Sequence, residues 1–179
     1  GATKGTMGVS SGKWYWEARL ITWSDSFIGI TDTEENITST SRGAETSNSA
    51  MIRQNNGDIR TGGSNSSYGN SQANGDILGF ALDMDNGAIY VGVNGTYYNS
   101  GDPTSGSSKT GKIADLTVTN QIMPMSYNYN GSATAYNFGG TPGFSISSGN
   151  SDANGYGNFE YAPPSGYYAL CTKNLAEFG

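Results

Sequence analysis

The sequence predicts an all-β protein in which two antiparallel β-sheets pack face to face as a β-sandwich. Three observations lead to this prediction. Several short segments alternate apolar and polar residues, which is the pattern of strands with one buried face. Asn-Gly turn signals separate many of these segments at short intervals. No window of about 11 residues or more has the apolar period of an α-helix.

The expected strands begin with residues 13–20, KWYWEARL, which place four side chains on one apolar face: Trp14, Trp16, Ala18 and Leu20. Residues 27–31 form a short second strand, and the polar run 32–49 is expected to be a long surface loop. Residues 50–54 and 58–60 are expected to form a hairpin around an Asn-Gly turn.

Residues 75–99 predict a three-stranded meander with turns at Asn86-Gly87 and Asn94-Gly95. Each Asn-Gly supplies the positive φ angles that a type I′ turn requires. A two-residue first turn predicts a register with three apolar pairs: Met84–Ile89, Leu82–Val91 and Phe80–Val93. We make the fold prediction depend on the burial of this apolar row and on the Leu82–Val91 pair, because a one-residue slip would turn the row outward.

The second turn of the meander is expected to place Tyr98 beside Val91 and Tyr97 over Gly92. An aromatic ring that lies across a strand glycine covers otherwise exposed backbone. Tyr97 is therefore expected to contact Gly92, although its position beside a loop also makes it a candidate for ligand binding.

The C-terminal half predicts three more strands, and the first is residues 121–129, in which Pro124 indicates an edge or a bulge. Residues 133–138 are its expected hairpin partner, and residues 167–171 are expected to be a closing strand. Because residues 121–129 carry no charge, we expect the chain's own loops or a partner subunit to cover this strand.

Length and composition predict a single domain over residues 1–179, with no shift in composition that marks a boundary. The abrupt ends of the sequence suggest a piece of a longer protein. The net charge is −6, and the nine basic residues are scattered, which argues against nucleic-acid binding. No apolar run is long enough for a membrane-spanning helix, so membrane insertion is not expected.

The absence of histidine removes Ser-His-Asp and Cys-His catalytic centres and zinc sites built from histidine and cysteine. Cys171 is the only cysteine, so no internal disulfide forms, and we expect a buried or edge thiol. Asp83-Met-Asp85 resembles the start of a calcium loop, but position 94 is Asn where an EF-hand needs Glu. A turn whose side chains satisfy its backbone is the favoured interpretation, and no metal or cofactor is predicted.

Five segments in order resemble the SPRY domain, a concanavalin A-like β-sandwich: SSGKWYWEARL (10–20), FIGITD (27–32), GDILGFALDMDNGAIYVGVNG (75–95), MPMSYNYNGSATAYNFG (123–139) and PPSGYYAL (163–170). The resemblance covers a core of about residues 10–171. It implies two packed antiparallel sheets, no enzymatic activity, and binding of peptides or proteins through loops at one end of the sandwich.

The closing residues PPSGYYALCTKNL also resemble SPRY-like segments in virion structural proteins of tailed phages. This second resemblance implies capsid decoration, a tail or fibre module, or adhesion to a host-surface glycan. The implied partners are other virion proteins or a host-surface glycan or protein, and a homo-oligomer is compatible with this reading. The implied location is the surface of the virion, and the host cytoplasm during assembly.

Two alternatives remain open at this stage. The first is a peptide-binding SPRY adaptor domain, although long Ser, Asn and Gly loops stand where animal members hold their peptide contacts. The second is a glycosidase on the same fold, which would need two carboxyl groups in a cleft. Glu34 and Glu35 lie in a loop and are expected to be a solvated pair rather than an acid and a base.

The candidate ligand-binding residues are aromatic and lie in or beside polar loops, a mixture typical of recognition surfaces: Trp23, Tyr68, Tyr97, Tyr127 and Tyr129. Trp23 would stack on a sugar or a partner side chain, or fold back over the edge of the sandwich. No catalytic residue is predicted.

Overall fold

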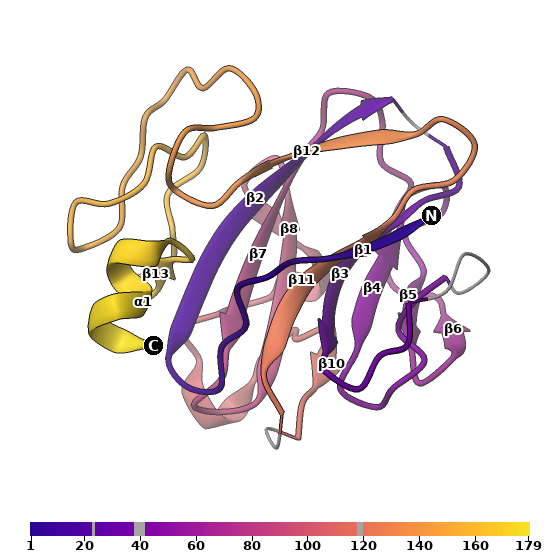
Figure 1. Ribbon diagram of the computed structural model, residues 1–179, viewed down its shortest axis with the longest axis horizontal. Coiled ribbons are helices and arrows are strands. Elements are labelled where there is room, and N and C mark those ends of the chain that lie inside the picture. Colours follow the sequence, from indigo (N-terminus) through magenta and orange to yellow (C-terminus); the bar gives the residue numbers. More distant parts are fainter. Residues whose placement is uncertain (23, 38–41, 118–119) are drawn as a thin grey trace.

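The computed structural model describes residues 1–22, 24–37, 42–117 and 120–179, and it confirms the predicted two-sheet sandwich (Figure 1). Sheet A contains six strands in the spatial order β1 (Ala2–Lys4), β11 (Ile122–Tyr127), β3 (Phe27–Asp32), β4 (Ala50–Arg53), β5 (Ile59–Thr61) and β6 (Ser64–Ser66). Neighbouring strands of this sheet are antiparallel.

Sheet B contains seven strands, and its main path runs β10 (Ala114–Asp115), β8 (Ala88–Val93), β7 (Ile77–Asp83), β2 (Lys13–Thr22) and β12 (Ala133–Asn137). Off this path, β9 (Thr96–Tyr97) pairs with β8, and β13 (Tyr168–Ala169) pairs with β2. The pair of β13 with β2 is parallel, whereas the other pairs are antiparallel.

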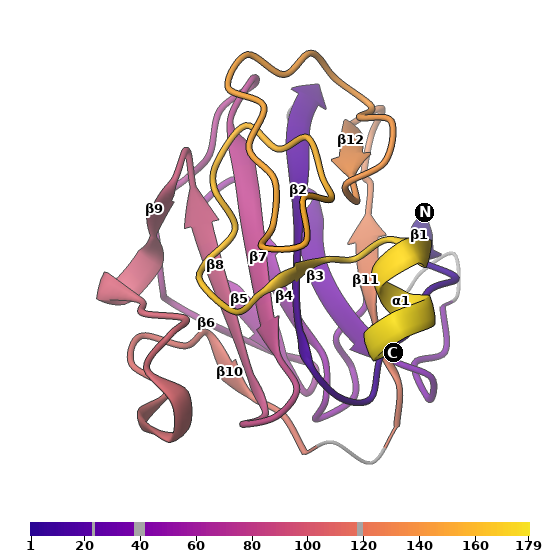
Figure 2. The same ribbon diagram turned by 90° about the vertical axis from the view of Figure 1, so that its left-hand side faces the viewer.

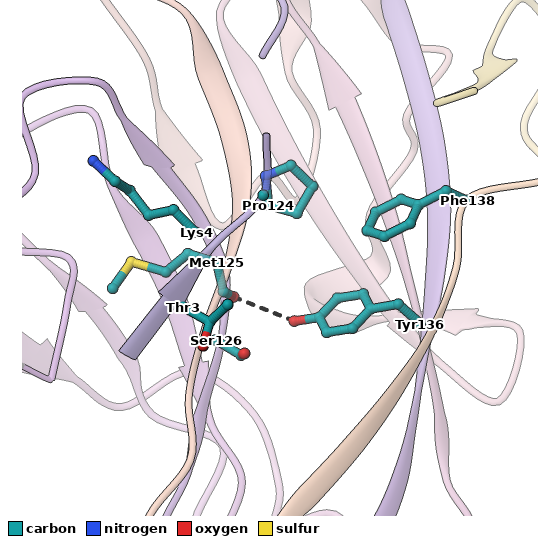
Figure 3. Close-up of a pocket in the computed structure, with 8 residues that line it drawn as sticks. Thr3, Lys4, Pro124, Met125, Ser126, Tyr136 and Phe138 are labelled. Atoms are coloured by element: carbon teal, nitrogen blue, oxygen red, sulfur yellow. Dashed lines mark hydrogen bonds between the residues drawn. The ribbon is translucent and has the colours of Figure 1, made fainter. Parts of the chain in front are cut away.

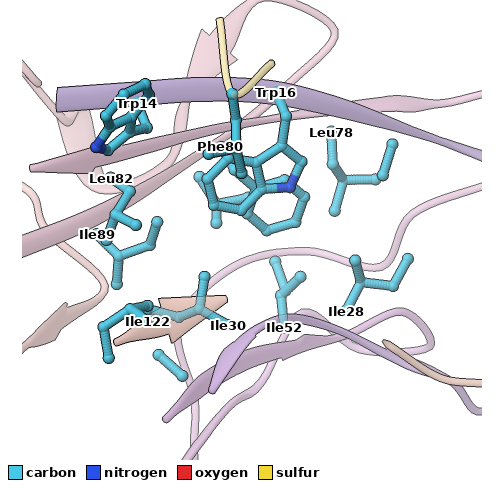
Figure 4. Close-up of a cluster of buried hydrophobic side chains, with 14 of the residues drawn as sticks. Trp14, Trp16, Ile28, Ile30, Ile52, Leu78, Phe80, Leu82, Ile89 and Ile122 are labelled. Atoms are coloured by element: carbon cyan, nitrogen blue, oxygen red, sulfur yellow. The ribbon is translucent and has the colours of Figure 1, made fainter. Parts of the chain in front are cut away.

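The inner layer consists of the apolar side chains between the two sheets (Figure 4). The four even-numbered side chains Trp14, Trp16, Ala18 and Leu20 of β2 are fully buried there, as the alternation predicts. Trp16 stacks on Phe80 of β7, with ring centroids 5.3 Å apart and planes 9° apart. Sheet A contributes Ile28, Ile30 and Ile52 from the opposite side.

The predicted register between β7 and β8 is wrong by two residues, because Leu82 pairs with Ile89 and Phe80 pairs with Val91. The connection has four residues, not two, since the carboxylate of Asp83 accepts hydrogen bonds from the backbone N–H groups of Asp85 and Asn86. Burial of the apolar row is nevertheless confirmed. A shift of two residues keeps every side chain on the same face of the sheet. The fold therefore requires the buried apolar row but does not require the Leu82–Val91 pair on which we made the prediction depend.

The second turn agrees with the prediction. Asn94 and Gly95 have φ angles of 50° and 82°, and Tyr97 pairs with Gly92. The strand pairing ends at Tyr97, however, because Tyr98 begins the 3₁₀ turn η1 (Tyr98–Ser100). A second 3₁₀ turn, η2 (Gly106–Ser108), follows in the same connection.

The strand β11 is not an edge, contrary to the expectation from its proline, since it lies between β1 and β3. The chain's own N-terminal strand therefore provides the cover that we expected for this segment. Pro124 is tolerated because its carbonyl faces the end of β1, where it accepts a hydrogen bond from Gly5 at 2.7 Å. In an antiparallel pair, the N–H and the C=O of one residue point to the same side of the strand. The N–H that Pro124 lacks would therefore point past the end of β1, where no strand pairing requires it.

The predicted hairpin across Asn130-Gly131 is also wrong, because β12 pairs with β2 in sheet B rather than with β11. Both turn residues have positive φ angles, of 46° and 77°, as the Asn-Gly signal predicts. The turn carries the chain from one sheet to the other, as Figure 1 shows at the upper edge of the sandwich. A turn signal of this kind specifies local geometry but not the strand that the next segment joins.

The outer layer is the segment 139–171, which crosses the face of sheet B that points away from sheet A (Figure 2). It buries the odd-numbered side of β2 as well, so that Tyr15 is only 2% exposed. Phe159 packs edge-on against Tyr15, with ring centroids 5.0 Å apart. The closing strand is shorter than predicted, and the helix α1 (Thr172–Phe178) follows it. None of the helices in the described part of the chain has the length and apolar character needed to cross a membrane.

Candidate functional sites

The structure brings together two of the five predicted ligand-binding residues. Tyr127 and Tyr129, at the end of β11, line a hollow of about 140 Å³ with Asp25 and Arg42, which we call the tyrosine hollow. The ring of Tyr129 is the more accessible of the two, because the residue is 53% exposed whereas Tyr127 is 9% exposed. Trp23 lies outside the described residues.

Two residues that line the tyrosine hollow have contacts that hold them in place. Arg53 donates two hydrogen bonds to the carboxylate of Asp25, at 2.5 and 2.8 Å, in the forked geometry typical of strong arginine–carboxylate pairs. These bonds hold the pKa of Asp25 below its usual value. Tyr127 packs edge-on against Phe27 at 6.4 Å between centroids. An exposed ring beside fixed charges suits a ligand with a flat apolar face and polar edges.

Tyr68 and Tyr97 have structural contacts in the structure. The hydroxyl of Tyr68 donates to the carbonyl of Gly111 at 2.9 Å, and its ring packs edge-on against Tyr98 at 6.0 Å. Burial raises the pKa of Tyr68 to about 12 and also raises the pKa of Tyr97. The ring of Tyr97 lies against Gly92, with Cδ1 3.4 Å from the position that a Cβ there would take.

Buried carboxylates bind backbone N–H groups at several points of the fold. Glu17 accepts hydrogen bonds from the N–H groups of Glu160 and Tyr161 at 3.0 and 2.8 Å, which ties the outer layer to β2. Burial raises the pKa of Glu17, while these donors act in the opposite direction. Asp83 holds its turn in the manner described above and also pairs with Lys13 at 3.2 Å, which confirms the turn interpretation of this segment.

The expectation of a solvated Glu34-Glu35 pair is wrong for Glu35, which is 3% exposed. Its Oε2 accepts hydrogen bonds from the backbone N–H groups of Glu45 and Thr46, at 2.9 and 3.3 Å, and from the hydroxyl of Ser49. The described residues of the segment 32–49 therefore do not all lie on the surface, because they include this buried carboxylate. Alternation cannot reveal such a residue, because its partners are backbone groups of an irregular segment.

An apolar groove lies where the edges of the two sheets meet (Figure 3). It has a volume of about 160 Å³ and is lined by residues of the β1 segment, by β11, and by Tyr136 and Phe138. These two rings stack with centroids 5.4 Å apart and planes 5° apart. Burial raises the pKa of Tyr136 to about 12, and its hydroxyl faces the carbonyl of Met125 at 3.4 Å.

A further hollow, which is polar, was not predicted from the sequence. Arg19 of β2 and Glu160 of the outer layer both line it, although they are far apart in the sequence. The alternation of β2 places Arg19 on the odd-numbered side, which would be expected to face water. Only the irregular outer layer turns that side into a hollow, so no local signal could have identified it.

The chain matches no protein-family model and no curated protein. Within residues 1–22, 24–37, 42–117 and 120–179, no three Cys, Asp or Glu side chains come together in a way that could hold a metal ion.

Proposed function

We propose that this chain is a SPRY-like, non-enzymatic binding module of a phage virion, used as capsid decoration or in a tail or fibre. The five ordered segments that resemble SPRY domains and the two-sheet architecture support this proposal. The closing segment supports the phage context. The module would lie on the virion surface and contact either a host-surface glycan or a neighbouring protein.

The observation that carries the proposal is the tyrosine hollow. Tyr129 exposes just over half of its surface beside Arg42 and the Asp25–Arg53 ion pair. An aromatic face next to fixed hydrogen-bonding groups favours binding without requiring any chemical step. Because Asp25 is already held by two hydrogen bonds from Arg53, binding of a ligand beside it costs little free energy for ordering that carboxylate.

The roles of the buried carboxylates support a non-enzymatic function. Glu17, Glu35 and Asp83 each accept hydrogen bonds from backbone N–H groups. A general acid or base must instead reach the proton that it transfers. We therefore assign these residues a structural role in holding loops. They do not supply the pair of carboxyl groups that a glycosidase would need.

The test combines a glycan array with binding to purified particles. Replacing Tyr129 with Ala (Tyr129→Ala) should weaken binding about tenfold or more, because loss of a central aromatic contact commonly has this effect. Ile21→Ala is the matched control, since Ile21 is also exposed, at 47%, but does not line the hollow. Binding to particle proteins alone would favour decoration, whereas purified particles that lack the protein would contradict the proposal.

A peptide-binding adaptor is the second candidate, and the apolar groove of Figure 3 favours it. Stacked Tyr136 and Phe138 opposite Pro124 form an apolar surface that an extended peptide could contact. A peptide-library screen should then enrich one motif, and Phe138→Ala should abolish the enrichment. A screen without an enriched motif would remove this candidate.

A further inference from the structure

The polar hollow contains an arginine that lacks a hydrogen-bond partner. Arg19 lies in β2 between Ile77 of β7 and Ala135 of β12, on the face covered by the outer layer. Its Nε is buried and donates to no other group among the described residues. The ion pairs formed by described residues do not include it. The side chain as a whole is half-buried and lines the hollow, so its guanidinium is open to an acceptor that enters there.

Other residues that line the hollow are held by hydrogen bonds. The backbone N–H of Ser147 donates to Glu160 at 2.7 Å, and the hydroxyls of Ser147 and Ser148 also donate to this carboxylate. Asn94 is held by the backbone N–H of Ile77 at 3.0 Å and by its own bond to Asp76 at 2.8 Å. Polar groups held in this way keep their positions before a ligand arrives, which lowers the entropic cost of binding.

The charges around the hollow oppose an anionic ligand. Among the described residues, Arg19 is the one cation that lines the hollow, whereas Glu160 also lines it and Asp76 is bonded to Asn94, another lining residue. Glu160, Glu17 and Asp76 all raise the pKa of Tyr161, another lining residue, after the larger effect of burial. A ligand that satisfies Arg19 must therefore accept a hydrogen bond without bringing a negative charge.

We propose that this hollow, the Arg19 hollow, binds one ring of a neutral saccharide through its hydroxyl groups. A sugar hydroxyl can accept from the guanidinium of Arg19 and donate to the remaining lone pairs of Glu160, because hydroxyls do both. The volume of about 230 Å³ lies below the roughly 300–1,000 Å³ of drug-sized sites, which suits one ring rather than a longer segment. The proposal does not depend on the function proposed for the tyrosine hollow.

The experiment is an NMR titration of the ¹⁵N-labelled chain that observes the Nε–H resonance of Arg19, assigned with Arg19→Lys. The probes are the methyl glycosides of glucose, galactose, mannose and N-acetylglucosamine, with glucuronate and inorganic phosphate as anionic comparisons. At least one neutral glycoside should shift the Arg19 Nε–H and the Ser147 amide resonances in a saturable way. Arg19→Gln should weaken that binding about tenfold or more, as expected when a charged hydrogen-bond donor is lost.

Two control variants separate the proposal from general effects. Arg60→Gln should leave the affinity unchanged, because the guanidinium of Arg60 is engaged elsewhere by Glu45, Asn65 and Gly43. Tyr129→Ala should also leave it unchanged, so that failure of the tyrosine hollow and failure of this site are distinguishable. The proposal is overturned if no neutral glycoside gives a saturable shift, if only glucuronate or phosphate binds, or if folded Arg19→Gln binds as the native chain does.

Discussion

The inner and outer layers cover the two faces of the same sheet, yet they are held by different interactions. In the inner layer, strand side chains such as Trp16 and Phe80 meet those of sheet A with a regular alternation. In the outer layer, irregular segments are attached to sheet B by carboxylates that accept backbone N–H groups, as Glu17 and Asp152 do. Apolar burial thus contributes to both faces, since Phe159 packs on Tyr15 in the outer layer, and directional hydrogen bonds to buried carboxylates are what the outer layer adds.

This difference separates stability from recognition. Close packing leaves few voids, so we expect ligand-sized hollows at the margins of the inner layer and outside it. An irregular segment held at a few points leaves hollows between those points, and the Arg19 hollow lies in such a place. We therefore expect substitutions in the inner layer to unfold the chain and substitutions in the outer layer to act locally.

The largest expected effect is that of Phe80→Ala in the inner layer. Phe80 is fully buried and stacked on Trp16, so truncation leaves a cavity that the two sheets cannot close. We expect a loss of about 3–5 kcal/mol in the free energy of unfolding, measured by urea denaturation. Ile21→Ala is the control, with an expected change within about 0.5 kcal/mol because Ile21 is exposed. A loss for Phe80→Ala no greater than that of the control would contradict the role of the inner layer.

The inner layer is also the part of the fold that the sequence predicts well. The alternation in residues 13–20 identifies which face of β2 is buried, and the apolar row of residues 80–84 identifies the same face of β7. These patterns work because burial depends on the side-chain period and not on a particular neighbour. The same argument explains why the sandwich was predicted although the β7–β8 register was wrong by two residues.

The outer layer and the candidate sites could not be predicted to the same extent. Their contacts join residues far apart in the chain, such as Glu17 with Tyr161, and their acceptors bind backbone groups that every residue carries. The turn at residues 130–131 has the expected local geometry but leads into another sheet. Tyr129 is predicted as a candidate because an aromatic in a polar loop is a local signal, whereas Arg19 resembles any outward-facing strand residue.

The second prediction tests the outer layer through Asp152→Ala. The carboxylate of Asp152 accepts from the backbone N–H groups of Asn154, Tyr156 and Ala169, each at 2.9 Å, and from Asn174 of α1 at 2.7 Å. Its removal leaves buried donors without acceptors, and we expect a loss of roughly 2–3 kcal/mol. Hydrogen exchange should become faster within residues 150–178 and stay slow in β2, β3 and β7.

A matched carboxylate distinguishes this local effect from a general effect of charge. Asp102 also accepts bonds from a residue two positions along the chain, Thr104, but it is exposed on the surface. Asp102→Ala should therefore leave hydrogen exchange in the outer layer unchanged. Equal acceleration in sheet A and in the outer layer for Asp152→Ala would show that the two layers do not open separately.

The smallest expected effect concerns Glu17 at the boundary between the layers, and it depends on pH. Burial raises the pKa of Glu17 in the folded chain, so the folded state holds this proton more tightly than the unfolded state does. The contribution of Glu17 to stability is then fully present below the unfolded pKa of about 4.3 and is lost as the pH rises through the folded pKa. The effect is small because the bonds from Glu160, Tyr161 and Tyr15 oppose burial.

The comparison that isolates this effect is the native chain against Glu17→Gln, by urea denaturation over a series of pH values. Gln stays uncharged at every pH. The free energy of unfolding of the native chain minus that of Glu17→Gln should therefore have its highest value in acid and fall as the pH rises. Asp25 and Asp115 have lowered pKa values, so their contributions to the free energy of unfolding are lost as the pH falls. Both residues are present in both proteins, so these contributions cancel in the difference. A difference that grows with pH would mean that the backbone donors outweigh burial. The attachment of the outer layer would then depend on the charge of Glu17 rather than merely tolerating it.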